Sequence, residues 1–117
     1  MKKLICLVLA LTLTVGLLAG CAKKTETIKI GSKDFTESLI VAEIYALALE
    51  DAGYTVERKM NIAGSLVHAA ITGGDIDIYP EYTGTGLLTI LKMEMNSDPD
   101  VVYNTVKDAY KEQFNIT

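Results

Sequence analysis

Three side chains in two short segments have the chemistry to bind a small zwitterion. Lys33 lies within residues 31–37 and directly precedes a predicted helix, whose free N–H groups and N-terminal dipole favour an anion. Tyr82 and Thr85 lie within residues 79–86 and offer an aromatic face and a hydroxyl. An aromatic ring attracts a quaternary ammonium, and a lysine pairs with a carboxylate. This combination predicts a site for a ligand that carries both groups.

The sequence contains few residues that could carry out catalysis. Nucleophilic or acid–base chemistry needs a nucleophile, a base and a group that orients the base. His68 is the single histidine, and it lies among apolar residues of a short predicted helix, where a structural role is expected. No Cys/His metal spacing, Gly-x-Ser-x-Gly elbow or phosphate-binding loop is present. The sequence therefore predicts a binding protein rather than an enzyme, without a metal or a cofactor.

An alternating series of strands and helices must position the two segments. The predicted strands span residues 25–30, 54–59 and 76–79. The predicted helices span residues 34–52, 65–72, 84–91 and 99–114. This order implies right-handed crossovers and an α/β fold, with a mostly parallel sheet flanked by helices. Ligands bind beyond the carboxyl ends of the strands in such sheets, which is where both segments lie.

The helix predicted at residues 34–52 has clear boundaries. Asp34 is a candidate N-cap with Glu37 three residues later, and Gly53 stands where a C′ glycine is expected. Apolar residues cover most of the circumference of this helix, which predicts that it is largely buried. The last predicted helix begins with Pro99, a residue type favoured at the first helical position.

The start of the chain has the order of an export signal. Lys2 and Lys3 are followed by an apolar run from residue 4 to about 18 and then by small residues before Cys21. This run is shorter than the roughly 20 residues that a membrane-spanning helix needs. The sequence Leu-Ala-Gly-Cys at residues 18–21 resembles the lipobox of bacterial lipoproteins, in which the cysteine is lipidated.

We therefore expect three parts: a signal peptide at residues 1–20, a short tether at 21–25 and a single domain at 26–117. Lipid on Cys21 would hold that domain at the outer face of the cytoplasmic membrane. The other cysteine, Cys6, would be removed with the signal, so the domain would contain no disulfide bond.

The charge balance excludes one class of partner. Removing Lys2 and Lys3 from the total leaves nine Lys and Arg against fifteen Asp and Glu. Binding to nucleic acid requires a basic surface, so an acidic domain argues against a nucleic-acid partner.

Four segments in the same order resemble one known family. They read GSKDFTE at residues 31–37, LEDAGY at 49–54, GDIDIY at 74–79 and PEYTGTG at 80–86. They are similar to the N-terminal part of the glycine betaine, carnitine and choline substrate-binding proteins of osmoprotectant ABC importers. The resemblance runs from about residue 28 to the last residue.

The resemblance implies a two-lobed type II periplasmic-binding fold that closes around a compatible solute and delivers it to a membrane permease. By their positions in the motifs, Tyr82 corresponds to a tyrosine of the cage around the trimethylammonium group. Lys33 and Thr85 correspond to residues that contact the ligand's carboxylate.

Length is the departure from this family, whose members are about three times as long. The fold expected here is therefore part of the first lobe, truncated before the second lobe, which would supply the remaining cage tyrosines and an arginine. The choice among glycine betaine, choline and carnitine depends largely on that second lobe. The alternative prediction is a lipid-anchored surface domain that does not bind a solute.

Overall fold

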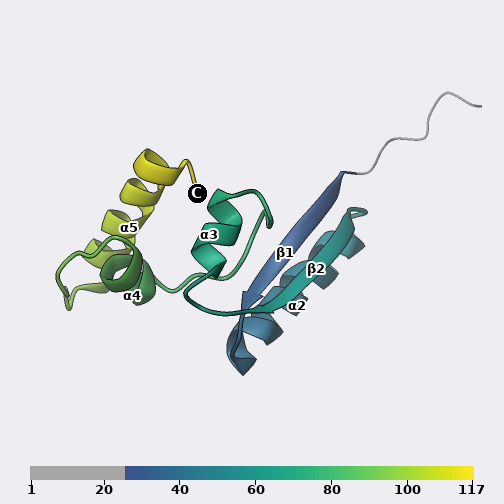
Figure 1. Cartoon of the computed structure of the whole chain (residues 1–117), viewed down its shortest axis with the longest axis horizontal. Coiled ribbons are helices and arrows are strands. Elements are labelled where there is room, and N and C mark those ends of the chain that lie inside the picture. The colour runs from purple at the N-terminus through teal and green to yellow at the C-terminus, as the bar shows by residue number, and fades with distance from the viewer. Residues whose placement is uncertain (1–25) are drawn as a thin grey trace, which may run out of the picture.

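The computed structural model describes residues 26–117 as a small α/β domain of two parallel strands flanked by helices. In chain order the elements are β1 (Thr27–Lys33), α2 (Thr36–Asp51), β2 (Thr55–Ile62), α3 (Val67–Thr72), α4 (Thr83–Thr85), the π-helical turn η1 (Gly86–Ile90) and α5 (Pro99–Phe114). The strands lie against α2, whereas α4 and α5 lie together at the other end of the molecule (Figure 1). The predicted signal peptide and tether, including Cys21, are outside the described residues.

The sheet is smaller than predicted. β1 and β2 pair in parallel, with Thr27 opposite Thr55, but the third predicted strand contributes only a single parallel bridge, Ile30 to Ile78. The backbone N–H of Lys29 donates to the carboxylate of Asp77 at 2.7 Å, where a regular ladder would supply a backbone carbonyl. A side chain thus takes the place of a backbone carbonyl next to the bridge, and residues 76–79 form no full strand.

Helix α2 begins differently from the prediction. Phe35, not Asp34, is the N-cap residue, and no side chain caps the helix. Ser38 in the first turn instead accepts a hydrogen bond from the backbone N–H of Lys33 at 2.9 Å. The predicted end is confirmed, because Gly53 follows the C-cap with a φ of 90°, a conformation that favours glycine.

One face of α2 packs on the sheet, where Ala42 and Ala46 form a core with Ile30. The opposite face carries Ile40 and Ile44, which are 55% and 56% exposed. The prediction of a largely buried helix is therefore wrong for the described residues, none of which packs over this outer face. The apolar residues that suggested burial are divided between two faces, and only one of them is covered.

The second core lies between η1 and α5. It consists of Leu87, Val102, Val106 and Tyr110. Helix α5 spans the predicted range, and the Asp98 side chain accepts hydrogen bonds from the backbone N–H groups of Asp100 and Val101. No helix within residues 26–117 is long and apolar enough to cross a membrane.

The predicted helix at residues 84–91 is divided into α4 and η1. The division lies where the backbone approaches α5 most closely. A Cβ atom added to Gly86 would lie 2.8 Å from Cγ1 of Val106 and 3.2 Å from the hydroxyl of Tyr110. Glycine is thus required here by the contact with α5, which brings the end of residues 79–86 against the second core.

Candidate ligand-binding site

Two of the three predicted ligand-binding residues come together. Lys33 ends β1 and Tyr82 precedes α4, and the Lys33 ammonium lies 5.2 Å from the centre of the Tyr82 ring. That distance is within the range of a cation–π contact. Thr85 ends α4 three residues after Tyr82 and is half-buried. The crevice segments predicted from the sequence are therefore adjacent, as expected for loops beyond the carboxyl ends of parallel strands.

Lys33 is buried, although most lysines are exposed. The residue is 3% exposed, and its ammonium forms an ion pair with the carboxylate of Glu81. A shift in the register of β1 and β2 between Gly31 and Lys33 interrupts the regular alternation of side chains at this end of β1. A buried charge must be paired, and Glu81 supplies the partner.

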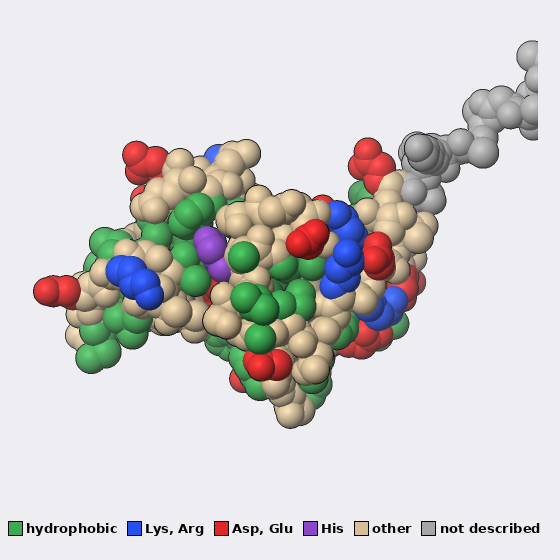
Figure 2. Space-filling view, in the orientation of Figure 1, with side chains coloured by type: hydrophobic (Ala, Val, Ile, Leu, Met, Phe, Trp, Pro, Cys, Tyr) green, Lys and Arg blue, Asp and Glu red, His purple; other side chains and the backbone are tan. Residues whose placement is uncertain are grey.

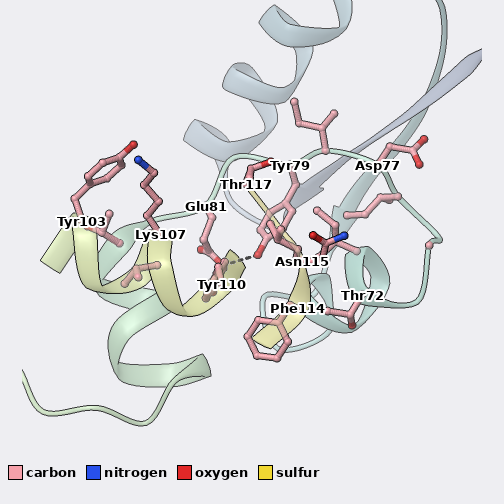
Figure 3. A pocket seen from close by; sticks show the side chains of 17 residues that line it. Thr72, Asp77, Tyr79, Glu81, Tyr103, Lys107, Tyr110, Phe114, Asn115 and Thr117 are labelled. Atoms are coloured by element: carbon pink, nitrogen blue, oxygen red, sulfur yellow. Dashed lines mark hydrogen bonds between the residues drawn. The ribbon is translucent and has the colours of Figure 1, made fainter. Parts of the chain in front are cut away.

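Glu81 joins the end of β1 to its own segment, residues 79–82. Besides Lys33, it accepts a hydrogen bond from the Tyr79 hydroxyl at 2.6 Å and another from the Tyr82 backbone N–H at 2.8 Å. Figure 3 shows the Tyr79 hydroxyl directed at this carboxylate. Burial, with the nearby Glu81 carboxylate, raises the pKa of Tyr79, so its hydroxyl remains a donor at neutral pH. We call Lys33, Tyr79, Glu81 and Tyr82 the Glu81 clamp.

An aromatic pair covers the outside of the clamp. The rings of Phe35 and Tyr82 lie 5.5 Å apart at an angle of 51°, and Phe35 is 41% exposed. Partial burial, together with the neighbouring Glu37 carboxylate, raises the pKa of Tyr82. This surface therefore presents two rings above a buried, neutralised ion pair.

Sequence reasoning missed the roles of Phe35 and Glu81. Both lie within the two segments that suggested a site: Phe35 is two positions after Lys33, and Glu81 directly precedes Tyr82. Their place in the motif was therefore the only signal in the sequence. The pairing of Glu81 with Lys33 joins residues 48 positions apart. A contact over that distance depends on the fold and cannot be read from local spacing.

The arrangement suits binding rather than catalysis. His68 on α3 packs its ring against Tyr110 and Phe114, at centroid distances of 5.5 and 4.6 Å. Burial lowers the pKa of His68. Within residues 26–117 no group of three or more His, Cys, Asp and Glu side chains is placed to hold a metal ion. The chemistry that remains is an aromatic surface next to a fixed lysine.

Comparison with known proteins agrees with this picture. The family model for the substrate-binding domain of ABC-type glycine betaine transport systems matches residues 26–117. A glycine-betaine-binding protein of Pseudomonas aeruginosa is 35% identical over 84% of this chain, which spans 32% of that protein. The carnitine transport binding protein OpuCC of Listeria monocytogenes is 37% identical over 99% of this chain, which spans 41% of that protein.

A solved structure supports the same assignment. Ligand-free YehZ from Escherichia coli superposes with a TM-score of 0.71 and 33% identity, covering 76% of this chain and 33% of YehZ. The chain thus spans between about a third and two-fifths of the length of these relatives. Members of this family bind substrates for transport and are not enzymes. The chain belongs to the family of substrate-binding domains of ABC-type glycine betaine transport systems.

Proposed function

We propose that this chain is part of the first lobe, in an incomplete copy, of the substrate-binding component of an ABC importer for quaternary-ammonium compatible solutes, such as glycine betaine, choline or carnitine. The observation that carries the proposal is the Tyr82 ring, paired with Phe35 and adjacent to Lys33, in a chain of this family. The names of two relatives refer to glycine betaine and carnitine. Such a component serves osmoprotection.

Each site residue has a distinct role in this proposal. The Tyr82 ring attracts the trimethylammonium group through its face, and Phe35 widens that aromatic surface. Lys33 and Thr85 bind the carboxylate of a zwitterionic solute. An ammonium has three donors, so Lys33 can retain Glu81 while it donates to a ligand. Glu81 then fixes the position of the lysine and does not itself contact the solute.

The site on one lobe is weak by itself. A well-desolvated cation–π contact contributes up to about 2 kcal/mol, whereas a micromolar dissociation constant corresponds to about 8 kcal/mol. The alternative function is a lipid-anchored surface domain that does not bind a solute. It is supported by the length of the chain, which spans only about a third to two-fifths of its relatives. The two functions differ in whether a second lobe completes the site.

The experiment is calorimetry on a hybrid protein. The chain is joined to the remainder of the L. monocytogenes relative and titrated with glycine betaine, choline and carnitine. Tyr82→Ala should weaken binding by up to roughly thirtyfold, whereas Tyr82→Phe should weaken it much less, because the ring face supplies the attraction. Equal affinity for the alanine variant and the unchanged hybrid would remove Tyr82 from the site. Micromolar binding by the chain alone would show that one lobe is sufficient.

The proposed location is the outer face of the cytoplasmic membrane, where lipid on Cys21 holds the domain beside a permease. The basis is the order of charged, apolar and small residues before Cys21. Cys21→Ser should release the protein from the membrane fraction or leave its signal uncleaved. If the original protein and the Cys21→Ser variant were both unprocessed and both remained in the membrane fraction, the result would contradict lipidation.

A further inference from the structure

The Tyr82 ring has a cation of the protein itself beside it. The Lys33 ammonium lies 5.2 Å from the centre of this ring, and a solute cation must come within about 6 Å of the same centre to be attracted by it. The two ammonium groups would therefore be no more than about 11 Å apart. Two positive charges at that distance repel each other unless another group neutralises one of them.

Glu81 is the group that neutralises the lysine. It forms an ion pair with Lys33, and the two side chains are only 16% and 4% exposed. Water and salt screen such a pair much less than an exposed one, so both charges act on their neighbours. At the Tyr82 ring the fields of the ammonium and the carboxylate therefore largely cancel. Glu37 is another acidic residue near Tyr82, but it is exposed, so water weakens its field.

The charge of Glu81 can be separated from its hydrogen bonds. The carboxylate accepts from the Tyr82 backbone N–H and from the Tyr79 hydroxyl. Glutamine has the same side-chain length and keeps one oxygen acceptor, and its amide can donate to a hydroxyl. Glu81→Gln therefore removes the negative charge while it retains groups that can hold Tyr79 and Tyr82 in place.

We propose that Glu81 admits cationic solutes to the Tyr82 ring by neutralising Lys33, and so sets the preference of the site between a cation such as choline and a zwitterion such as glycine betaine. This inference rests on the proposed function and adds a specificity-determining residue that acts through the lysine. A cation experiences only repulsion from a lysine without its partner. A zwitterion experiences the same repulsion at its ammonium and an attraction at its carboxylate, so the two effects offset each other.

The test uses the hybrid protein described above, which contains the full chain, and calorimetry with choline and glycine betaine at neutral pH. Glu81→Gln should weaken choline binding about tenfold or more, because the repulsion of two charges about 11 Å apart at an effective dielectric constant of about 20 has that effect. It should change glycine betaine binding by less than about threefold. The ratio of the two affinities therefore shifts toward the zwitterion.

Lys33→Met makes the opposite change in charge and leaves no buried ammonium without a partner. Choline binding should stay equal or become tighter, whereas glycine betaine binding should weaken because its carboxylate loses a donor. The double variant Lys33→Met with Glu81→Gln is neutral again, and it should recover most of the choline binding that Glu81→Gln alone loses. The matched control is Glu57→Gln, in the exposed pair with Lys59, which should alter the affinity ratio by less than about twofold.

A merely structural role for Glu81 gives a different pattern. Glu81→Gln would then weaken both solutes alike, and the double variant would recover no choline binding. Either of these results, or an unchanged affinity ratio in Glu81→Gln, would overturn the proposal. If Glu81→Gln did not fold, equal weakening of both solutes by Lys33→Met would overturn it as well. Absence of binding by the unchanged hybrid would contradict the proposed function itself, and the inference would fall with it.

Discussion

The Glu81 clamp and the second core, between η1 and α5, differ in how their polar groups are satisfied. In the clamp, one carboxylate accepts from Lys33, the Tyr79 hydroxyl and the Tyr82 N–H. In the second core, the Tyr110 hydroxyl is buried near Tyr79 and Glu81 but has no hydrogen-bond partner among residues 26–117. Nδ1 of His68, whose ring packs against Tyr110, also lacks a partner among the described residues. The polar groups of the clamp are thus satisfied, whereas these two are not.

This difference separates what the domain does alone from what it needs a partner to do. A satisfied, partly buried network holds its side chains in one arrangement, so the Tyr82 ring is positioned before any ligand arrives. An exposed apolar face gains stability when something covers it. The outer face of α2, which carries Ile40 and Ile44, is of this kind. Apolar side chains also gather between α5 and α3 on the face shown in Figure 2.

The largest expected effect comes from breaking the clamp. Glu81→Ala leaves the Lys33 ammonium buried without its partner, and such a loss costs about 3–5 kcal/mol. We expect the free energy of unfolding in urea to fall by that amount. The matched control is Glu57→Ala, which removes an exposed pair with Lys59 at 3.6 Å and should have a far smaller effect. Equal losses would show that the clamp is no more than a surface ion pair.

A smaller effect should come from the contact between η1 and α5. Gly86→Ala would place a methyl group 2.8 Å from Cγ1 of Val106, and overpacking of this kind costs about 1–3 kcal/mol. Gly84→Ala is the control, because a Cβ there meets no atom within 4 Å. Thermal or urea unfolding of both variants checks the prediction. A tolerated Gly86→Ala would mean that α5 is loosely attached to η1.

The smallest effect at neutral pH concerns Tyr110. Burial, with the Glu81 carboxylate nearby, raises the pKa of Tyr110 from 10.0 to about 12. The unfolded chain therefore loses this proton first, so the contribution of Tyr110 to stability is constant below about pH 10 and falls as the pH rises toward 12. Tyr110→Phe should make this alkaline loss shallower, measured by urea unfolding at about pH 8 and pH 11. An unchanged slope would contradict the raised pKa.

Local patterns predicted most of the elements but not their long-range contacts. Gly53 and Pro99 marked helix boundaries correctly because each acts through its own backbone conformation. The capping spacing of Asp34 was misleading, because Phe35 is the N-cap residue and no side chain caps α2. The third predicted strand forms only one bridge, and the Asp77 side chain accepts the Lys29 N–H next to it, a contact that no alternation pattern reports.

The site was predicted in part for the same reason. The family motif indicated Lys33 and Tyr82, and the fold brings them within 5.2 Å. The burial of Lys33 follows from a register shift at the end of β1 and from a partner far along the chain, neither of which is visible in the spacing of residues. The role of Thr85 in binding stays a prediction.

The central claim is that the polar groups of the Glu81 clamp are satisfied within residues 26–117, whereas the Tyr110 hydroxyl of the second core is not. The most direct test compares Tyr79→Phe with Tyr110→Phe, because the two tyrosines are 8% and 6% exposed and each change removes one hydroxyl. Tyr79→Phe should lower the free energy of unfolding by about 1.5–3 kcal/mol, since it breaks a hydrogen bond to a charged group. Tyr110→Phe should leave that free energy unchanged or raise it. Equal losses in the two variants would contradict the account.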